Sequence, residues 1–158
     1  MSRFHRFATS TTLPLGREEL FPFFADAANL EVITPPELRF AILTPGVAMR
    51  EGALIRYRLR LMGVRFGWLT RIAHWDPPNE FVDEQLKGPY TTWVHRHRFT
   101  PVQGGTLMED EVTYSLPLFP LGEIAAPLVN LQVRRIFAYR GHAIRRAFGL
   151  EDVGGPVR

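Results

Sequence analysis

Six segments with alternating apolar and polar residues follow one another between residues 38 and 116, and they constrain the fold more than any other feature of the chain. A period of two is typical of a strand with one buried face. Short runs rich in glycine, proline and asparagine separate most of the segments, so neighbouring strands are expected to pair antiparallel. The expected strands are Leu38–Leu43, Ala53–Met62, Val64–Trp75, Glu80–Lys87, Thr91–Thr100 and Thr106–Leu116.

Helical patterns flank this block of strands. Before it, Phe4–Leu13 reads as a first strand, followed by two short helices over residues 17–24 and 26–31. After it, Gly122–Phe148 is one long helical pattern, with Pro127 placed in the first turn or at a kink. The pattern predicts an α+β protein. The apolar stripe of the long helix consists of Val129, Val133, Ile136, Phe137, Ile144 and Phe148.

Length and composition fit one domain, expected over residues 1–149, with a flexible tail over residues 150–158. The absence of cysteine excludes disulfides, thiolate nucleophiles and zinc–thiolate sites. No run of 18 apolar residues indicates a membrane span, and the N-terminus lacks the apolar core of a signal peptide. We therefore expect a cytoplasmic protein without a transmembrane segment.

The basic residues do not favour nucleic-acid binding. The net charge is only +3, which is a weak electrostatic footprint for such a partner. The arginines at positions 56, 58, 60, 96 and 98 alternate with apolar residues on predicted strands, and Glu109 and Glu111 occupy the matching face of another strand. Cross-strand ion pairs on a solvated sheet face are the simpler expectation.

The segment Gly88–Phe99 carries the most unusual strand face. After the turn at Gly88-Pro89, alternation places Trp93, His95, His97 and Phe99 on one side. A solvated face rarely combines tryptophan with phenylalanine, and a plain core face rarely carries two imidazoles. This face is therefore expected to line a cavity.

The order of elements and several short motifs resemble the START-related superfamily, also called SRPBCC, which includes polyketide cyclase-like and birch-pollen-allergen-like proteins. A bacterial branch is similar in the pattern Gly-Pro-Tyr-x-x-Trp-x-His-x-His-x-Phe, which begins here at Gly88. Further similar segments are Asn29–Pro36, Trp75–Pro78, Phe81–Gln85 and Gly105-Thr106. The resemblance covers about residues 3 to 149.

This resemblance implies a helix-grip fold, in which a seven-stranded antiparallel sheet curls around the long C-terminal helix and leaves a tunnel for a hydrophobic ligand. The strand faces agree, because apolar and aromatic residues oppose arginines along the strands. The expected ligand-binding residues are Tyr57, Leu59, Phe66, Trp68, Thr70, Gln85, Trp93, His95, His97, Phe99, Asp110, Val112, Tyr114, Val133 and Phe137.

Three interpretations of the polar residues on the inward face stay open. Asp110 needs a partner there, and His95 or His97 is the obvious one. The group is a structural hydrogen-bond network, a recognition site for a polar group of the ligand, or an acid–base pair for a cyclase or dehydratase, in which His95, His97 and Asp110 are the candidate catalytic residues. His74 and Asp83 are further polar residues expected on this face.

A metal site is a weaker alternative. His95 and His97 lie on one face within reach of one ion, with His74, Asp110 or Glu84 as a possible third ligand. The spacing alone is a weak signal, and we expect neither metal nor cofactor. Nucleophilic and phosphate-binding motifs are missing from the sequence.

The sequence thus favours a module that binds, transports or presents a small hydrophobic molecule, and enzymatic activity is the less favoured alternative. A ligand-free interaction module is the third, and it predicts no pocket above about 300 Å³. The loop Leu116–Leu121 is apolar where solvent normally selects polar residues, so it is a lid over the tunnel, a homodimer contact or a membrane-touching edge.

Overall fold

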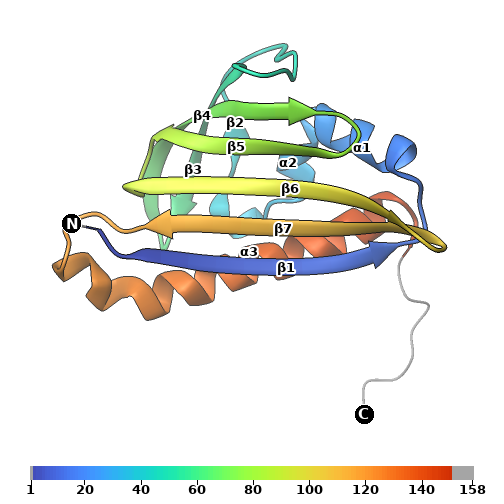
Figure 1. Cartoon of the computed structure of the whole chain (residues 1–158). Helices are drawn as coiled ribbons and strands as arrows, with labels where there is room; N and C mark the ends of the chain where they lie inside the picture. The colour runs from blue at the N-terminus through green and yellow to red at the C-terminus, as the bar shows by residue number, and fades with distance from the viewer. Residues whose placement is uncertain (1, 151–158) are drawn as a thin grey trace.

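A computed structural model describes residues 2–150 and shows a seven-stranded sheet with a long helix packed along one face (Figure 1). The strands are β1 (Phe4–Leu13), β2 (Ala41–Ile42), β3 (Leu54–Leu61), β4 (Val64–Asp76), β5 (Glu80–Lys87), β6 (Thr92–Val102) and β7 (Gly105–Ser115). The helices are α1 (Arg17–Ala25), α2 (Asn29–Val32) and α3 (Ala126–Ala147), with 3₁₀ turns η1 (Pro36–Leu38) and η2 (Leu121–Ala125).

The sheet has the strand order β1-β7-β6-β5-β4-β3-β2, and every neighbouring pair is antiparallel. Five consecutive strands, β3 to β7, form a meander, and β1 pairs with β7 from the far end of the sequence. This confirms the predicted α+β class and the helix-grip arrangement. The predicted tail lies in residues 151–158, outside the described residues, apart from Leu150.

The tight connection between β3 and β4 shows why the sequence folds as a meander. Met62 and Gly63 form a two-residue loop, and both have positive φ, at 50° and 80°. Two consecutive residues in this region are typical of a type I′ turn, whose twist matches that of the flanking strands. The turn sets the register that pairs Leu61 with Val64 and keeps the apolar residues of both strands on one face.

Two predicted elements differ from the structure. The strand predicted over Leu38–Leu43 is only the two-residue β2, because Pro36 opens a 3₁₀ turn and Arg39 then takes a left-handed conformation with φ 45°. The long helix begins later than predicted, since residues 121–125 form the separate turn η2. Pro127 lies in the first turn of α3, as predicted, where its missing N–H costs nothing.

An irregularity in β4 corrects a third expectation. The pairing of β4 with β5 shifts between Ile72 and His74, which reverses the alternation beyond that point. The His74 side chain is therefore 47% exposed and lies 3.4 Å from Glu80, away from the cavity.

The outer face of the sheet carries cross-strand ion pairs, as the alternation predicted, but among the described residues they join other partners than the expected ones. Arg96 pairs with Glu80 at 2.8 Å, and Arg6 pairs with Glu111 at 2.6 Å. Arg71 pairs with Glu84. The arginines of β6 thus bond mainly to the neighbouring β5.

The inner face of the sheet and α3 enclose the core. Val129, Val133, Phe137 and Ile144 of α3 are buried, which confirms most of the predicted stripe. Within residues 2–150, no helix is long and apolar enough to cross a bilayer.

Candidate functional site

A cavity of about 140 Å³ lies between strands β3 to β6, the C-terminal half of α3 and the segment from α1 to residue 49. Most of its wall is aromatic or aliphatic. Its polar wall residues are Asp83, His95, His97 and Arg140, together with Tyr57, Thr70 and Thr34. Small-molecule sites usually combine a mainly apolar wall with a few convergent polar groups.

Two histidines and two aspartates form a crossed hydrogen-bond network at the polar end of the cavity. The register places His95 opposite Asp83, and His97 opposite Asp110. The shortest contacts run diagonally: His95 Nε2 lies 2.7 Å from Asp110 Oδ1, and His97 Nε2 lies 2.6 Å from Asp83 Oδ2. His97 Nδ1 also lies 3.2 Å from Asp110 Oδ1. The two imidazole rings lie side by side, with centroids 3.6 Å apart. Each histidine therefore bonds the carboxylate that stands opposite the other.

Arg140 completes this network from α3. Its Nη2 donates to His97 Nδ1 at 3.2 Å and lies 3.6 Å from Asp110 Oδ1. The side chain is 8% exposed, and its guanidinium lies over the Phe24 ring at 5.3 Å. The helix thus supplies a guanidinium beside the buried Asp110 and the partly buried Asp83.

The electrostatics fix the charge states of the carboxylates and of one histidine. Burial alone acts to raise the pKa of Asp110, but the Arg140 guanidinium, the hydrogen bond from His95 and the nearby His97 outweigh it and hold this pKa well below its ordinary value. For Asp83, burial is likewise outweighed, by the hydrogen bond from His97 and the positive charges nearby, and its pKa is lowered. Burial, reinforced by His97, lowers the pKa of His95 to about 4, against the opposing effect of Asp110. His95 is therefore neutral at pH 7.

The tautomer of His95 follows from this state. Because an ionised carboxylate only accepts, His95 Nε2 carries the proton and donates to Asp110, and Nδ1 keeps a lone pair. Nδ1 lies 3.7 Å from Asp83 Oδ2, too far for a hydrogen bond. Apart from the imidazoles, the network holds two carboxylates against one guanidinium, which is a net charge of −1.

The same side chains meet the distance requirement for a metal site. Asp83, His95 and His97 offer ligand atoms that all lie within 4.8 Å of one another, so the third ligand is none of the residues expected for that role. Two features disfavour an ion. His97 Nε2 and Asp83 Oδ2 are hydrogen-bonded at 2.6 Å, whereas two ligands of a tetrahedral zinc lie about 3.3 Å apart. Arg140 would also face a divalent cation at short range. The absence of a metal stays our prediction.

A hydroxyl pair continues the polar wall toward β3 and β4. Tyr57 Oη and Thr70 Oγ1 lie 2.8 Å apart. Burial, together with the nearby charge of Asp83, raises the pKa of Tyr57, so its hydroxyl stays protonated. Since two hydroxyl protons serve one hydrogen bond, the pair has one further donor.

Eight of the fifteen expected ligand-binding residues line the cavity, and all eight lie on the strand faces or the helix stripe that the alternation assigned to the interior. They are Tyr57, Leu59, Trp68, Thr70, Trp93, His95, His97 and Phe137.

The other seven lie elsewhere, for identifiable reasons. Asp110, Val112, Tyr114 and Val133 are buried on the predicted face, but they do not line the cavity, and the last three pack together in one apolar cluster. Phe99 packs under α1 with Phe21 and Phe24. Of the remaining two, Phe66 lines an outer groove, and Gln85, on β5, hydrogen-bonds the Tyr90 backbone.

Sequence reasoning missed Arg140 and did not assign Asp83 to the site. A signal for Arg140 exists, because it lies three residues after Phe137 and four before Ile144. A cation in the apolar stripe of a helix calls for a buried anion. The wall from Phe24 to Met49 had no comparable signal, since the sequence does not show which loop closes a cavity.

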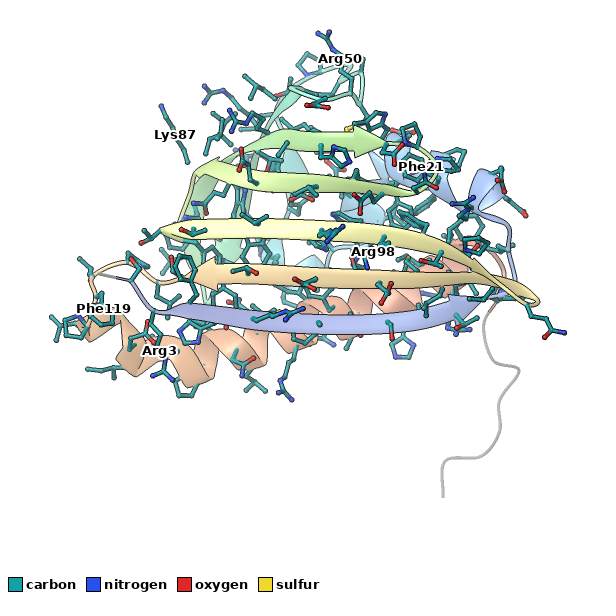
Figure 2. The ribbon with its side chains drawn as sticks, in the orientation of Figure 1. Arg3, Phe21, Arg50, Lys87, Arg98 and Phe119 are labelled. Atoms are coloured by element: carbon teal, nitrogen blue, oxygen red, sulfur yellow. The ribbon has the colours of Figure 1, made fainter. Side chains whose placement is uncertain are left out.

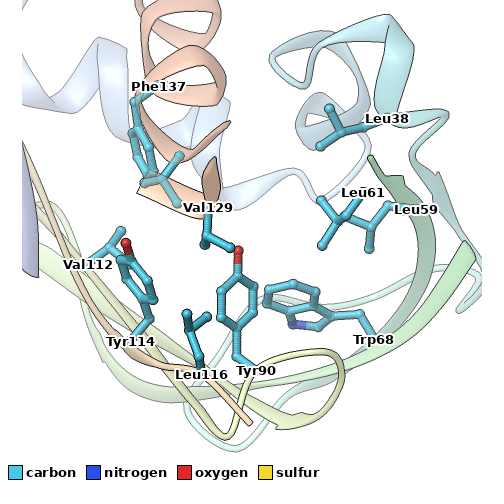
Figure 3. Close-up of a cluster of buried hydrophobic side chains, with 11 residues drawn as sticks. Leu38, Leu59, Leu61, Trp68, Tyr90, Val112, Tyr114, Leu116, Val129 and Phe137 are labelled. Carbon is cyan, nitrogen blue, oxygen red and sulfur yellow. The ribbon is translucent and has the colours of Figure 1, made fainter. Parts of the chain in front are cut away.

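A second hollow, an apolar groove of about 310 Å³, adjoins the cavity at Leu61 and Tyr90, which line both. Figure 3 shows Tyr90 standing between Tyr114 and Trp68, and its ring centroid lies 5.6 and 5.7 Å from theirs. Gln85 fixes the Tyr90 backbone: its Nε2 donates to the carbonyl at 2.7 Å, and its Oε1 accepts from the N–H at 3.2 Å. Gln85 thus fixes the position of Tyr90, which separates the two hollows.

The loop Leu116–Leu121 borders the groove and does not line the cavity. Leu116 is buried, whereas Phe119 projects at the end of the molecule where α3 begins (Figure 2). An exposed apolar stripe starts here and continues along the outer side of α3. Its members, each more than half exposed, are Leu121, Ile124, Leu128 and Leu131. A dimer contact and a membrane-touching edge both fit this surface, and the possible homodimer stays a prediction.

No family model matches the chain, and no curated protein does. Solved structures do match. A START superfamily protein from Mycobacterium smegmatis has a TM-score of 0.65 at 14% identity, over 88% of this chain and 97% of that one. Ginseng major latex-like protein 151 from Panax ginseng has a TM-score of 0.64 at 10% identity, over 91% and 97%. A protein from Thermus thermophilus has a TM-score of 0.68 at 21% identity, over 90% and 95%.

The chain has the helix-grip fold of START-like proteins. The resemblance expected from the motifs is thereby confirmed at the level of the fold, since these identities carry no more than that.

Proposed function

We propose that the protein binds a small, mainly apolar molecule in the cavity between the sheet and α3. The observation that carries this proposal is the wall itself, in which aromatic side chains surround a space that ends at Asp83 and His95. An open space beside a polar network adds nothing to its stability if the role of the network is only structural.

The volumes of the two hollows favour a ligand of limited size. The cavity, at about 140 Å³, is close to engineered cavities of about 150 Å³ that bind benzene. By itself it lies below the usual range for ligand sites, and the adjoining groove of about 310 Å³ reaches that range. A one-ring molecule fits the cavity with Tyr90 in place, and a longer one needs both hollows.

The lowered pKa of His95 supports binding over acid–base catalysis. A base with a pKa of about 4 has little tendency to take a proton at pH 7. Its Nδ1 is better suited to accept a hydrogen bond. A pH-dependent turnover that disappears in a His95→Asn variant would establish the enzymatic alternative instead.

Native mass spectrometry of the purified protein, combined with solvent extraction, tests the proposal with the ligand it acquires in the cell. A Leu59→Phe variant places extra atoms in the cavity and is expected to lose the bound compound. Leu54→Phe is the matched control, because Leu54 lies on the same strand with its side chain 50% exposed. Equal ligand content in both variants and the wild type would contradict binding in this cavity.

A further inference from the structure

The polar end of the cavity offers unpaired hydrogen-bond acceptors. Within residues 2–150, Oδ1 of Asp83 has no hydrogen-bond donor, and the Asp83 side chain is 17% exposed and lines the cavity. Nδ1 of His95 likewise has no donor among the described residues, since its proton is on Nε2. The two groups stand on paired positions of β5 and β6. A ligand that donates a hydrogen bond therefore finds two acceptors at one place.

The charge of the network selects against an anion. Two carboxylates face one guanidinium, so the net charge is −1 with neutral imidazoles and zero if one imidazole is protonated. In either state a carboxylate ligand would bring a third buried anion to a single arginine, and burial of an uncompensated charge is costly. Arg140 Nη2 already faces His97 and Asp110, and the buried Nε of this guanidinium has no acceptor among the described residues.

The hydroxyl pair of Tyr57 and Thr70 adds the complementary requirement. It has one donor beyond its internal hydrogen bond. A ligand group that both donates and accepts satisfies Asp83 and this pair together. Ethers, ketones and carboxylates only accept, whereas a hydroxyl group does both.

We propose that the cavity selects a neutral ligand whose hydroxyl group donates a hydrogen bond to Asp83. This inference rests on the proposed binding function and names the class of molecule bound, a phenol or a cyclic alcohol with about one ring at the polar end. His95 is a second acceptor for the same hydroxyl group, and the aromatic wall contacts the ring.

Three one-ring probes test the selection: phenol, which donates; anisole, which only accepts; and benzoate, which is anionic. Dissociation constants are measured by ligand-observed NMR at pH 7.5. A hydrogen bond to a charged acceptor favours phenol by about ten- to a hundredfold. The extra methyl group of anisole strengthens anisole binding by about fourfold, which offsets part of this difference. We expect phenol to bind about tenfold more tightly than anisole, and benzoate to bind most weakly.

The variant Asp83→Asn removes the charged acceptor while keeping the side-chain shape. The ratio of the anisole dissociation constant to the phenol dissociation constant should therefore fall toward one. Glu84→Gln is the control, since Glu84 neighbours Asp83 on β5 but pairs with Arg71 on the outer face. Circular dichroism verifies folding, and the wild-type ratio decides the question even if Asp83→Asn does not fold. Equal binding of phenol and anisole, or tightest binding of benzoate, overturns the selection while the proposed function stands. Failure of all three probes in the wild type counts against the proposed function itself.

Discussion

Replacing Arg140 by methionine should destabilise the protein strongly, because it removes the guanidinium that lies beside the buried Asp110 and the partly buried Asp83. Methionine has a similar length and helix propensity, so packing and helix formation change little. Removing one partner of a buried ion pair costs about 3–5 kcal/mol. For a chain of this size each kcal/mol corresponds to about 2–4 °C, so the melting temperature should fall by about 6–20 °C.

Arg135→Met is the matched control on the same helix. Arg135 is also ion-paired, with Glu37 at 3.1 Å, but both side chains are at least half exposed. Exposed pairs contribute about 0–1 kcal/mol. Urea unfolding followed by tryptophan fluorescence gives both free energies of unfolding.

The pH dependence identifies the cause of the loss. In the wild type the pKa of Asp110 is depressed, so its stabilising contribution is present above the unfolded value and is lost as the pH falls below about 4. Without Arg140 this pKa rises, and the carboxyl group takes up its proton at a higher pH. The stability difference between wild type and Arg140→Met should therefore narrow between pH 7 and pH 4. Equal small losses for both variants, or a difference that does not change with pH, would refute the electrostatic role of Arg140.

Other outcomes follow from the same contacts. Because the pKa of His95 is lowered to about 4 in the folded protein, the unfolded state binds this proton first as the pH falls. The free energy of unfolding should therefore drop by about 3 kcal/mol between about pH 6.5 and pH 4. Urea titrations of a His95→Gln variant should show a smaller drop. Gly88→Ala would place a Cβ 2.4 Å from Gln85 Oε1. It should lower the free energy of unfolding by about 1–3 kcal/mol, because it displaces the two hydrogen bonds to Tyr90. In a Gln85→Ala background the same substitution should cost little, and equal costs in both backgrounds would contradict this coupling. Metal analysis should find no stoichiometric zinc, iron or nickel. If the exposed stripe is a dimer contact, light scattering should show a dimer that Leu128→Ser dissociates, and a monomer at high concentration would exclude that role.

The sheet and its two faces follow from the sequence pattern alone. Alternation with a period of two, interrupted by turn residues, fixes strand direction and register locally, and Met62-Gly63 shows how two residues set a whole hairpin. The same alternation correctly turned His95 and His97 inward, because in a regular strand every second residue shares a face. At the bulge after Ile72 this rule fails, and with it the inward placement of His74.

The sequence pattern does not show which inward residues line an open space or which partner each polar group takes, because both depend on packing between remote elements. Asp110 and Tyr114 face the interior as expected, yet neither lines the cavity. The diagonal hydrogen bonds of the histidines depend on side-chain rotamers, which periodicity does not describe. Arg140 reaches this network from a helix 30 residues after Asp110 along the chain. Alternation indicates on which face of a strand a side chain lies, whereas a binding site depends on distances between elements that are remote in sequence.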